Sequence, residues 1–370
     1  MCAIGGNRRG TRSAPRNRRA LTLQYMSSER QEGKRKRKAN ELILSADKRT
    51  LANQRRTMTE HSDLLEIVRR PLSPDVQLEV QASWEEYERV QAILDNEESR
   101  YPRLWYDGAR NIALVAAPPS GLHANMAGGL MASIIREVLT QQGLSSEVSR
   151  GFTLSTETGN TRGRTTRGWD GAMLYQEGDR ETLMIAVEVG VSQSYESLRA
   201  AISWCVCALY CRLGIAMCIH EQRRGDTPDP PQYSSIQEEV AAVGEAEEDF
   251  RRQLTERPYG PLVRDGVTWF GRIQRVVLET YRAPDASITE SMILDPSRSF
   301  TIVEDGEFVG GDVPPNLQEV VLGDCIPEHI LDGDAIVARP VNFFRRDWFE
   351  ARFRAGMVRT AGNRMRPRRA

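Results

Sequence analysis

Lysine is missing from most of this sequence. All four lysines lie before residue 49, and every fixed positive charge after that point is an arginine. A lysine can lose its proton when it is buried, whereas an arginine keeps its charge at any working pH. A proton transfer that depends on lysine is therefore excluded from residue 49 onward.

Two further absences bound the class of protein. No stretch of eighteen residues is apolar throughout, so we expect no helix that crosses a membrane. Residues 1–9 also lack the apolar run of a secretory signal. Both absences favour an intracellular protein without a membrane partner.

Cysteine is scarce, with six residues and no Cys-x-x-Cys pair. Four of them lie in one apolar stretch, 205–218, rather than along the chain as a disulfide framework would be. We expect these four to be buried as small hydrophobic residues, and a zinc site is the alternative. Unpaired cysteines also fit a reducing, intracellular compartment.

The net charge of −1 conceals a strong asymmetry. Residues 1–60 carry sixteen Lys and Arg against five acids, and residues 345–370 carry nine Arg against two acids. The remaining residues, 61–344, therefore carry a net charge of −19. A body of this charge repels polyanions, so contact with DNA or RNA is expected to begin at the basic tails.

Composition divides the chain into three parts. Residues 1–72 are expected to form a disordered basic arm, because they start with a long segment rich in Arg, Ser and Asn and poor in aromatics. Residues 73–345 are expected to form one folded domain, interrupted at 223–261 by an acidic, solvent-exposed and partly helical insertion. Residues 346–370 are expected to form a basic tail.

The arm contains a continuous basic run, Lys34-Arg35-Lys36-Arg37-Lys38. Such a run is typical of a nuclear import signal or of an arm that binds phosphate. The alternative is a solvated charged tail. On the first interpretation the protein is nuclear rather than cytoplasmic.

Hydrophobic spacing and turn residues predict an α/β fold. One helix is expected from Ser73 to about Asn96, because a cap residue and a proline precede apolar residues at helical spacing. Ser120 is expected to cap the next helix. The other predicted helices are 122–138, 198–209 and 342–356, and the predicted strands are 112–116, 151–155, 170–175, 183–189, 214–219, 267–281, 319–322 and 335–338, with a loop at 156–168 and a turn at Gly178-Asp179.

The middle of this order carries two acids at the ends of neighbouring strands. Trp169-Asp170-Gly171 opens one strand, and Val187-Glu188-Val189-Gly190 closes the next. With the order helix, three strands, helix, strand, the segment from about 102 to 220 resembles the PD-(D/E)XK nuclease superfamily, in a branch of restriction-endonuclease-like proteins. Further motifs that resemble this branch are Tyr106-Asp107-Gly108, Pro118-Pro119-Ser120, His123, Ser192 and Trp204.

The resemblance implies a central mixed sheet flanked by helices, with a Mg²⁺ site at the two acids. Asp170 and Glu188 are then the candidate catalytic residues and metal ligands, and the main-chain carbonyl of Val189 is a third candidate ligand. Mg²⁺ prefers hard oxygen ligands, and acids at the ends of adjacent antiparallel strands can converge on one ion. Glu137 and His123 are candidates for contacts behind these ligands.

Each candidate also has a structural interpretation. Asp170 has the alternative of an ordinary residue at a strand start. For Glu188 this alternative is weaker, because an unpaired charge at the end of a buried strand is costly. His123 can hold a backbone group at the helix entry instead of contacting a substrate.

The sequence departs from the family at the position of its lysine. Gly190 stands two residues after the second acid, and the following helix offers only Arg199. Arg199 is a candidate catalytic residue that can stabilise a phosphate but cannot accept a proton. Arg162, Arg164 and Arg167, in the loop before the first acid, are candidates for phosphate contacts; a charged loop without a ligand is the alternative.

These residues predict a divergent relative of Mg²⁺-dependent nucleases that hydrolyses weakly or not at all and binds nucleic acid or a protein partner. The alternative is an active metal-dependent endonuclease that hydrolyses phosphodiester bonds of DNA or RNA. The missing lysine and the acidic body favour the first function, and the two acids favour the second.

Overall fold

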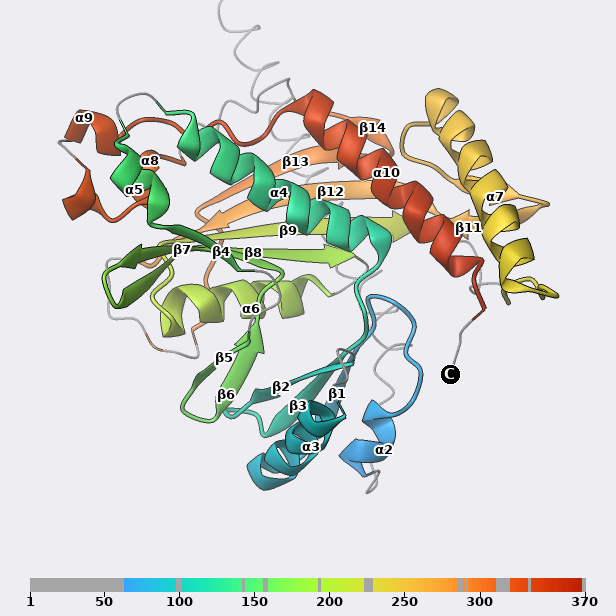
Figure 1. Cartoon of the computed structure of the whole chain (residues 1–370), viewed down its shortest axis with the longest axis horizontal. Coiled ribbons are helices and arrows are strands. Elements are labelled where there is room, and N and C mark those ends of the chain that lie inside the picture. The colour runs from blue at the N-terminus through green and yellow to red at the C-terminus, as the bar shows by residue number, and fades with distance from the viewer. Residues whose placement is uncertain are drawn as a thin grey trace, which may run out of the picture. The chain divides into compact units, whose positions relative to one another are not determined.

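The computed structural model describes most of the chain after residue 62, and all of this part belongs to one compact unit, Thr57–Ala370 (Figure 1). The described residues are 63–97, 102–141, 144–155, 159–191, 194–222, 229–284, 289, 292–310, 320–331 and 334–367. The basic run 34–38 and the predicted arm up to residue 62 lie outside them. No helix in the described ranges is long and apolar enough to cross a membrane.

A seven-stranded mixed sheet forms the centre of the unit, with the strand order β14-β13-β12-β9-β8-β7-β4. All neighbouring strands run antiparallel except β8 and β9, which run parallel. The strands are β4 (Phe152–Ser155), β7 (Gly171–Glu177), β8 (Arg180–Val191), β9 (Leu213–Gln222), β12 (Arg272–Tyr281), β13 (Arg298–Glu304) and β14 (Glu307–Phe308). The α/β class with a mixed sheet, predicted from the sequence, is confirmed.

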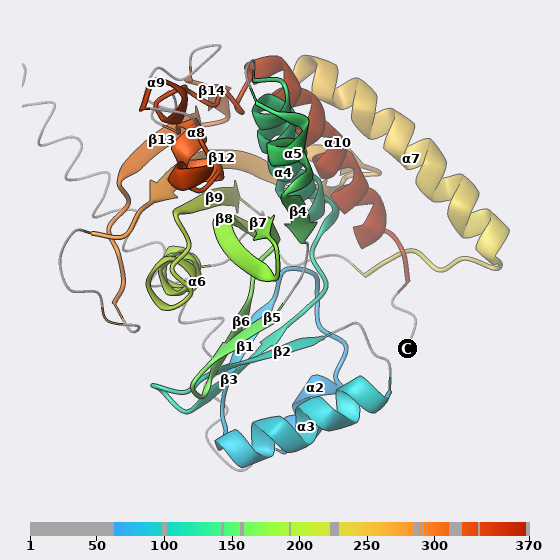
Figure 2. The ribbon, with the colours of Figure 1, turned by 60° about the vertical axis from the view of Figure 1, so that its left-hand side comes forward.

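Helices cover both faces of this sheet because its central strands are apolar on both sides. Along β8, Ile185 and Val187 pack into the core under α4 (Gly121–Leu139), whereas Ala186 packs into the core under α6 (Tyr195–Ala208). Side chains alternate between the faces of a strand, so Glu188 points to the same face as Ala186. Figures 1 and 2 show α4 and α6 on opposite sides of the sheet.

The predicted order of elements is present in the main sheet. Helix α4 precedes β4, β7 and β8, which are antiparallel neighbours, and α6 then connects β8 to the parallel strand β9. Glu177 pairs with Arg180 across the two-residue turn at Gly178-Asp179, and Gly178 has a φ of +58°. Glycine adopts this backbone conformation without strain, which explains the turn.

A second, five-stranded sheet lies beside the first and was largely missed by the sequence patterns. Its strand order is β1-β3-β2-β6-β5. Helices α2 (Leu64–Val68) and α3 (Trp84–Asn96) pack on one face of it, so the predicted arm boundary at 72 falls too late (Figure 2). The strands are β1 (Gln77–Gln81), β2 (Arg103–Asp107), β3 (Ile112–Ala116), β5 (Gly159–Arg162) and β6 (Thr165–Gly168).

Two sequence predictions in this sheet are wrong. The helix predicted from Ser73 begins only at Trp84, because Ser83 caps it by accepting a hydrogen bond from the Glu86 amide at 3.1 Å, and the preceding residues form β1. The predicted loop 156–168 contains a hairpin of β5 and β6. Strand β1 pairs with the distant strand β3, and the β5–β6 hairpin lacks the apolar residues by which a strand is usually recognised.

The predicted insertion and C-terminal tail are also corrected. Helix α7 (Ile236–Glu256) is not fully solvent-exposed, because Val243 and Phe250 on one face are buried in the core. Helix α10 (Arg346–Arg364) buries Phe349 and Phe353 in the same core, so most of the predicted tail is part of the fold.

The remaining elements are short. The strands predicted at 319–322 and 335–338 are wrong, since the described residues there form α8 (Leu322–Cys325) and α9 (Asp334–Val337), with only an isolated bridge at Val321. The five described cysteines are buried free thiols, as expected of small hydrophobic residues. The other elements are α5 (Ser146–Arg150), β10 (Leu262–Arg264), β11 (Val267–Phe270) and the 3₁₀ helix η2 (Glu328–Ile330).

Candidate functional site

A cavity of about 280 Å³ lies between the five-stranded sheet and the main body. Strands β1, β2, β3 and β6 line one side, and α4, α6 and the ends of β7 and β8 line the other. Its wall includes two arginines, two tryptophans, one histidine and three acids. The cavity therefore joins charged and aromatic groups from distant parts of the chain.

Asp170 and Glu188 face each other at one end of this cavity. Gly171 pairs with Val187 in the antiparallel β7–β8 ladder, and the Asp170 amide donates to the Val187 carbonyl at 3.1 Å. Asp170 immediately precedes β7 and Glu188 follows Val187 on β8, and both line the cavity. The sequence predicted this placement; a metal-binding role for the pair stays a prediction.

Both carboxylate oxygens of Asp170 are engaged. Oδ2 accepts a hydrogen bond from the main-chain amide of Val189 at 2.7 Å, and Oδ1 lies 2.8 Å from Nε2 of His123. The imidazole contact has ion-pair distance, although the ring N–H is not aligned as a hydrogen bond. Burial alone would raise the pKa of Asp170, but His123 and the Val189 amide outweigh it and lower that pKa. Asp170 is therefore ionised.

His123 lies between two acids at the start of α4. Ser120 caps the helix by accepting from the His123 amide at 3.2 Å, and Asp75 accepts from the Ser120 amide at 2.7 Å. The same Asp75 oxygen lies 3.4 Å from Nδ1 of His123. Burial would lower the pKa of His123, yet Asp170 and Asp75 raise it well above its ordinary value. The imidazole is therefore protonated at neutral pH.

The pKa of Glu188 shifts in the opposite direction from that of its neighbour Asp170. Its side chain is buried, at 9 % exposure, and its Oε1 has no hydrogen-bond partner. Burial and the charge of Asp170 raise the pKa of Glu188 well above its ordinary value, despite nearby cations. A buried polar atom without a partner is costly and is typical of a site that binds a ligand.

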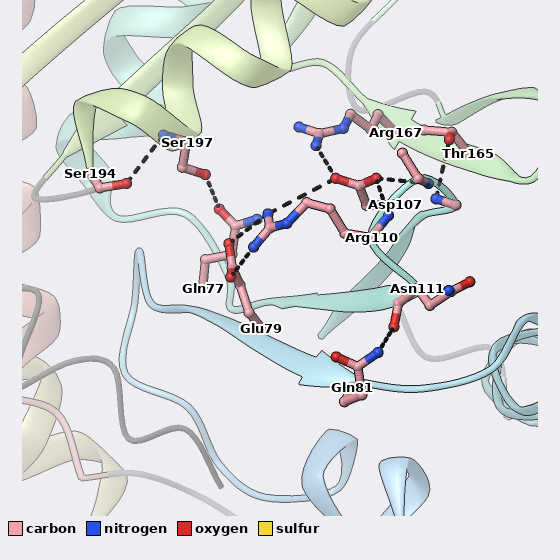
Figure 3. A network of polar contacts seen from close by, with 12 residues as sticks. Gln77, Glu79, Gln81, Asp107, Arg110, Asn111, Thr165, Arg167, Ser194 and Ser197 are labelled. Carbon is pink, nitrogen blue, oxygen red and sulfur yellow. Dashed lines mark hydrogen bonds and ion pairs between the residues drawn. The ribbon is translucent and has the colours of Figure 1, made fainter. Parts of the chain in front are cut away.

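Arg167 and Arg103, from the five-stranded sheet, bring positive charge to the cavity. Arg167 donates to Oδ2 of Asp107 at 3.3 Å (Figure 3), and its Nε has no hydrogen-bond partner. Arg103 and Trp105 alternate with buried residues along β2, which places both on the cavity face of the strand. These groups suit an anion with an attached planar ring.

The other predicted arginines do not reach the cavity. Arg162 donates to the Ala208 carbonyl and, at 3.1 Å, to the Tyr210 hydroxyl, and Arg164 lies in the β5–β6 turn against Gly108. Arg199 donates to the Leu294 carbonyl at 2.6 Å. These three side chains are not among the residues that line the cavity, and their predicted roles in phosphate contact and catalysis stay predictions.

The geometry of α6 and α4 explains why Arg199 and Glu137 lie away from the cavity acids. Ser197 and Ala201 line the cavity, and Arg199 between them faces away at the helical angle of about 100° per residue, where it pairs with Asp295 at 2.6 Å. Glu137 follows His123 by fourteen positions on α4, a distance of roughly 21 Å along the helix axis. Glu137 is therefore not a neighbour of the two acids.

The sequence patterns missed Asp75, Arg103 and Gln77 as cavity residues. Gln77 accepts a hydrogen bond from the Ser197 hydroxyl at 3.3 Å and so links the five-stranded sheet to α6 (Figure 3). Asp75 was assigned to the first turn of a helix that begins later. Leucine, tryptophan and tyrosine follow Arg103 in succession, so no alternation of polar and apolar residues marked it in the sequence.

The two facing carboxyl groups are hard oxygen ligands of the kind that Mg²⁺ uses, and Mg²⁺ needs only one or two protein carboxylates. The unpartnered Oε1 of Glu188 fits such a role. No group of three or more His, Cys, Asp or Glu side chains in the described ranges is arranged to hold a metal. A cation would therefore depend on Asp170, Glu188 and ligands from water or substrate.

Comparison with protein-family models, with curated proteins and with solved structures found no match to this chain.

Proposed function

We propose that the protein is a divergent relative of the PD-(D/E)XK nucleases that binds nucleic acid at the cavity and hydrolyses it slowly or not at all. The observation that carries this proposal is that Asp170, just before β7, and Glu188, on β8, line one cavity together with Arg167. The order of α4, β4, β7, β8, α6 and β9 supports the relationship.

Asp170 and Glu188 would hold Mg²⁺, which supplies polarisation of a phosphate and a lower pKa for a bound water. Arg167 and Arg103, on the other side of the cavity, would bind the phosphate oxygens. The half-buried Trp105 beside them would stack on a base. The cavity residues thus match the anionic and aromatic parts of one nucleotide.

We expect slow hydrolysis because the side chains at the cavity do not replace the missing lysine as a general base. No lysine exists from residue 49 onward, and Arg199 lies outside the cavity. His123 holds its proton at neutral pH, so it cannot serve there as a general base. A missing base or water-positioning group typically costs about a hundredfold to ten-thousandfold in rate.

An active metal-dependent endonuclease is the second candidate, and one observation favours it. His123 is a proton carrier in direct contact with Asp170, in a site where the family's lysine is missing. A protonated imidazole can donate to a leaving oxygen. On this candidate function, His123 would be the residue that compensates for the lysine.

The test uses the full-length chain with labelled single- and double-stranded DNA and RNA. Binding is measured by fluorescence anisotropy and hydrolysis by gel, each with Mg²⁺, with Mn²⁺ and with chelator. We expect Arg167→Gln to weaken binding roughly tenfold or more, because it removes a charged hydrogen-bond donor. The exposed Arg252→Gln on α7 is the matched control.

Two results would contradict the proposal. Equal affinity of the wild type and Arg167→Gln for every nucleic acid would remove the cavity as the binding site and leave a protein partner as the alternative. Rapid cleavage that disappears in both Asp170→Asn and Glu188→Gln would establish the active nuclease instead.

A further inference from the structure

The first sixteen residues of α4 carry no acid, in a body that is otherwise strongly acidic. Residues 121–136 contain no Asp or Glu, whereas residues 61–344 carry a net charge of −19. Ala124, Gly128 and Ala132 are exposed at four-residue steps, which forms a smooth line along the helix. Ala124 and Gly128 also line the cavity, so this line of small residues leads into it.

Helix α10 lies alongside α4 on the same face of the main sheet and supplies arginines to this surface (Figure 1). Arg345, Arg352, Arg359 and Arg366 recur every seven residues, and all four are exposed. The first and last of them pair with acids, Arg345 with Asp347 at 3.1 Å and Arg366 with Glu239 at 3.7 Å. Arg352 and Arg359 have no acidic partner among the described residues.

Glycines of α4 hold the stems of these two arginines close to the helix. A Cβ at Gly121 would lie 2.8 Å from Cβ of Arg359, and a Cβ at Gly129 would lie 3.7 Å from Cγ of Arg352. The Leu122 amide donates to Oγ1 of Thr360 at 2.8 Å, which fixes the register of the two helices. The two arginine side chains therefore leave α10 from points about 10 Å apart along its axis.

We propose that α4 and α10 form an entry surface for one single strand of nucleic acid, whose phosphates contact Arg352 and Arg359 and whose end reaches the cavity over Ala124 and Gly128. A Cβ at Gly128 would meet no atom within 4 Å, so a backbone can approach this part of α4 closely. Entry of the strand into the cavity rests on the proposed function, whereas the phosphate contacts of Arg352 and Arg359 do not.

The size of the cavity selects a single strand over a duplex. Its volume of about 280 Å³ is at the lower end of pockets for one small ligand. Glu188 is only 9 % exposed within it, so one nucleotide unit can approach the acids whereas a paired helix cannot. Arginines that follow a backbone, together with an aromatic residue for a base, are the usual elements of single-strand binding.

The test compares two matched alanine-to-glutamate variants of the full chain. Ala132→Glu places an acid on the line of small residues, and Ala241→Glu places one at an exposed position of α7. We expect Ala132→Glu, and the double variant Arg352→Gln/Arg359→Gln, to weaken binding of a labelled oligothymidylate about tenfold or more. Ala241→Glu should leave the affinity within twofold.

Two further measurements make this test more specific. They are the salt dependence of the binding affinity and the affinity of variants that keep the positive charge. Loss of two phosphate contacts should reduce the slope of log K against log salt by about 1.4 for a single strand. Arg352→Lys/Arg359→Lys should retain most of the affinity, because each lysine keeps the charge. Circular dichroism of each variant checks that α4 and α10 remain folded.

Three results would overturn the inference: unchanged affinity in the double glutamine variant, an equal loss in Ala241→Glu, or tighter binding of duplex than of single strand. A nucleoside monophosphate probe separates the two proposals. If Arg167→Gln leaves its binding unchanged while the double glutamine variant loses oligonucleotide binding, the cavity proposal fails and the arginine contacts stand.

Discussion

Nε2 of His123 lies 2.8 Å from Oδ1 of Asp170, where the start of α4 meets the start of β7. Against the effect of burial, this contact lowers the pKa of Asp170. Burial and the charge of Asp170 raise the pKa of Glu188. Two adjacent carboxylates ionise together only when a further positive charge arrives.

Replacement of His123 by Gln should destabilise the fold in a pH-dependent manner. The pKa of His123 is raised in the folded state, so its stabilisation is complete below its ordinary pKa and is lost as pH rises through the raised pKa. We expect a loss of about 1 to 3 kcal/mol near pH 6 that shrinks at alkaline pH. Urea unfolding of both proteins across this range measures it, and a loss that grows with pH would contradict the assignment.

Replacement of Glu188 by Gln should stabilise the fold instead, although here too the wild type loses stability relative to the variant as pH rises. The pKa of Glu188 is also raised, and for an acid this means that stability is lost as pH rises above about 4.5 toward the raised value. The wild type loses up to about 1.4 kcal/mol for each pH unit in that interval, and the neutral glutamine loses none. We therefore expect Glu188→Gln to be more stable than the wild type at pH 8 and similar to it at pH 4. Lower stability of the variant at pH 8 would show that Glu188 is ionised and paired.

Helix α10 should be essential for the stability of the fold, which would not be true of a basic tail at residues 346–370. Arg364 near its end donates to both carboxylate oxygens of the fully buried Glu221, at 2.7 and 2.8 Å. Glu221→Ala leaves Arg364 without this partner, so we expect a loss of about 3 to 5 kcal/mol. Glu248→Ala is the matched control, since its exposed pair with Arg251 contributes at most about 1 kcal/mol. Equal unfolding free energies of these two variants would refute the role of α10.

The basic run at Lys34–Lys38 is predicted to direct nuclear accumulation. It lies outside the described residues, so the prediction rests on its charge density alone. A fluorescent reporter fused to residues 1–60 should concentrate in the nucleus, and a fusion with the run changed to alanine should not. A fusion that distributes like the free reporter would count against the signal.

Local patterns predicted the elements that hold the two acids. Strand β8 contains the apolar run 183–187, and the turn before it contains a glycine, so both the strand and its pairing with β7 followed from neighbouring residues. The placement of Glu188 and Asp170 near the same end of these strands followed from that pairing. The protonation of Glu188 did not, because it depends on three-dimensional burial.

The parts that sequence patterns missed all depend on distant contacts. The hairpin β5–β6 is rich in Gly, Thr and Arg, and Thr166 is buried because its hydroxyl donates to Tyr87 at 3.0 Å and accepts from the Tyr106 amide at 2.8 Å. Arg199 was a candidate because it lies on the right helix, but its direction depends on the angular position of each residue around α6.

One oxygen atom of Asp75 serves two purposes, since it accepts from the amide that begins α4 and faces the imidazole of His123. A substitution at this position therefore alters the start of a helix and the charge of the cavity at the same time. A mutation at residue 75 therefore cannot change the charge of the cavity while the start of the helix is preserved. Among the residues around the cavity, this is where selection for a stable fold and selection for chemistry would act on the same atom.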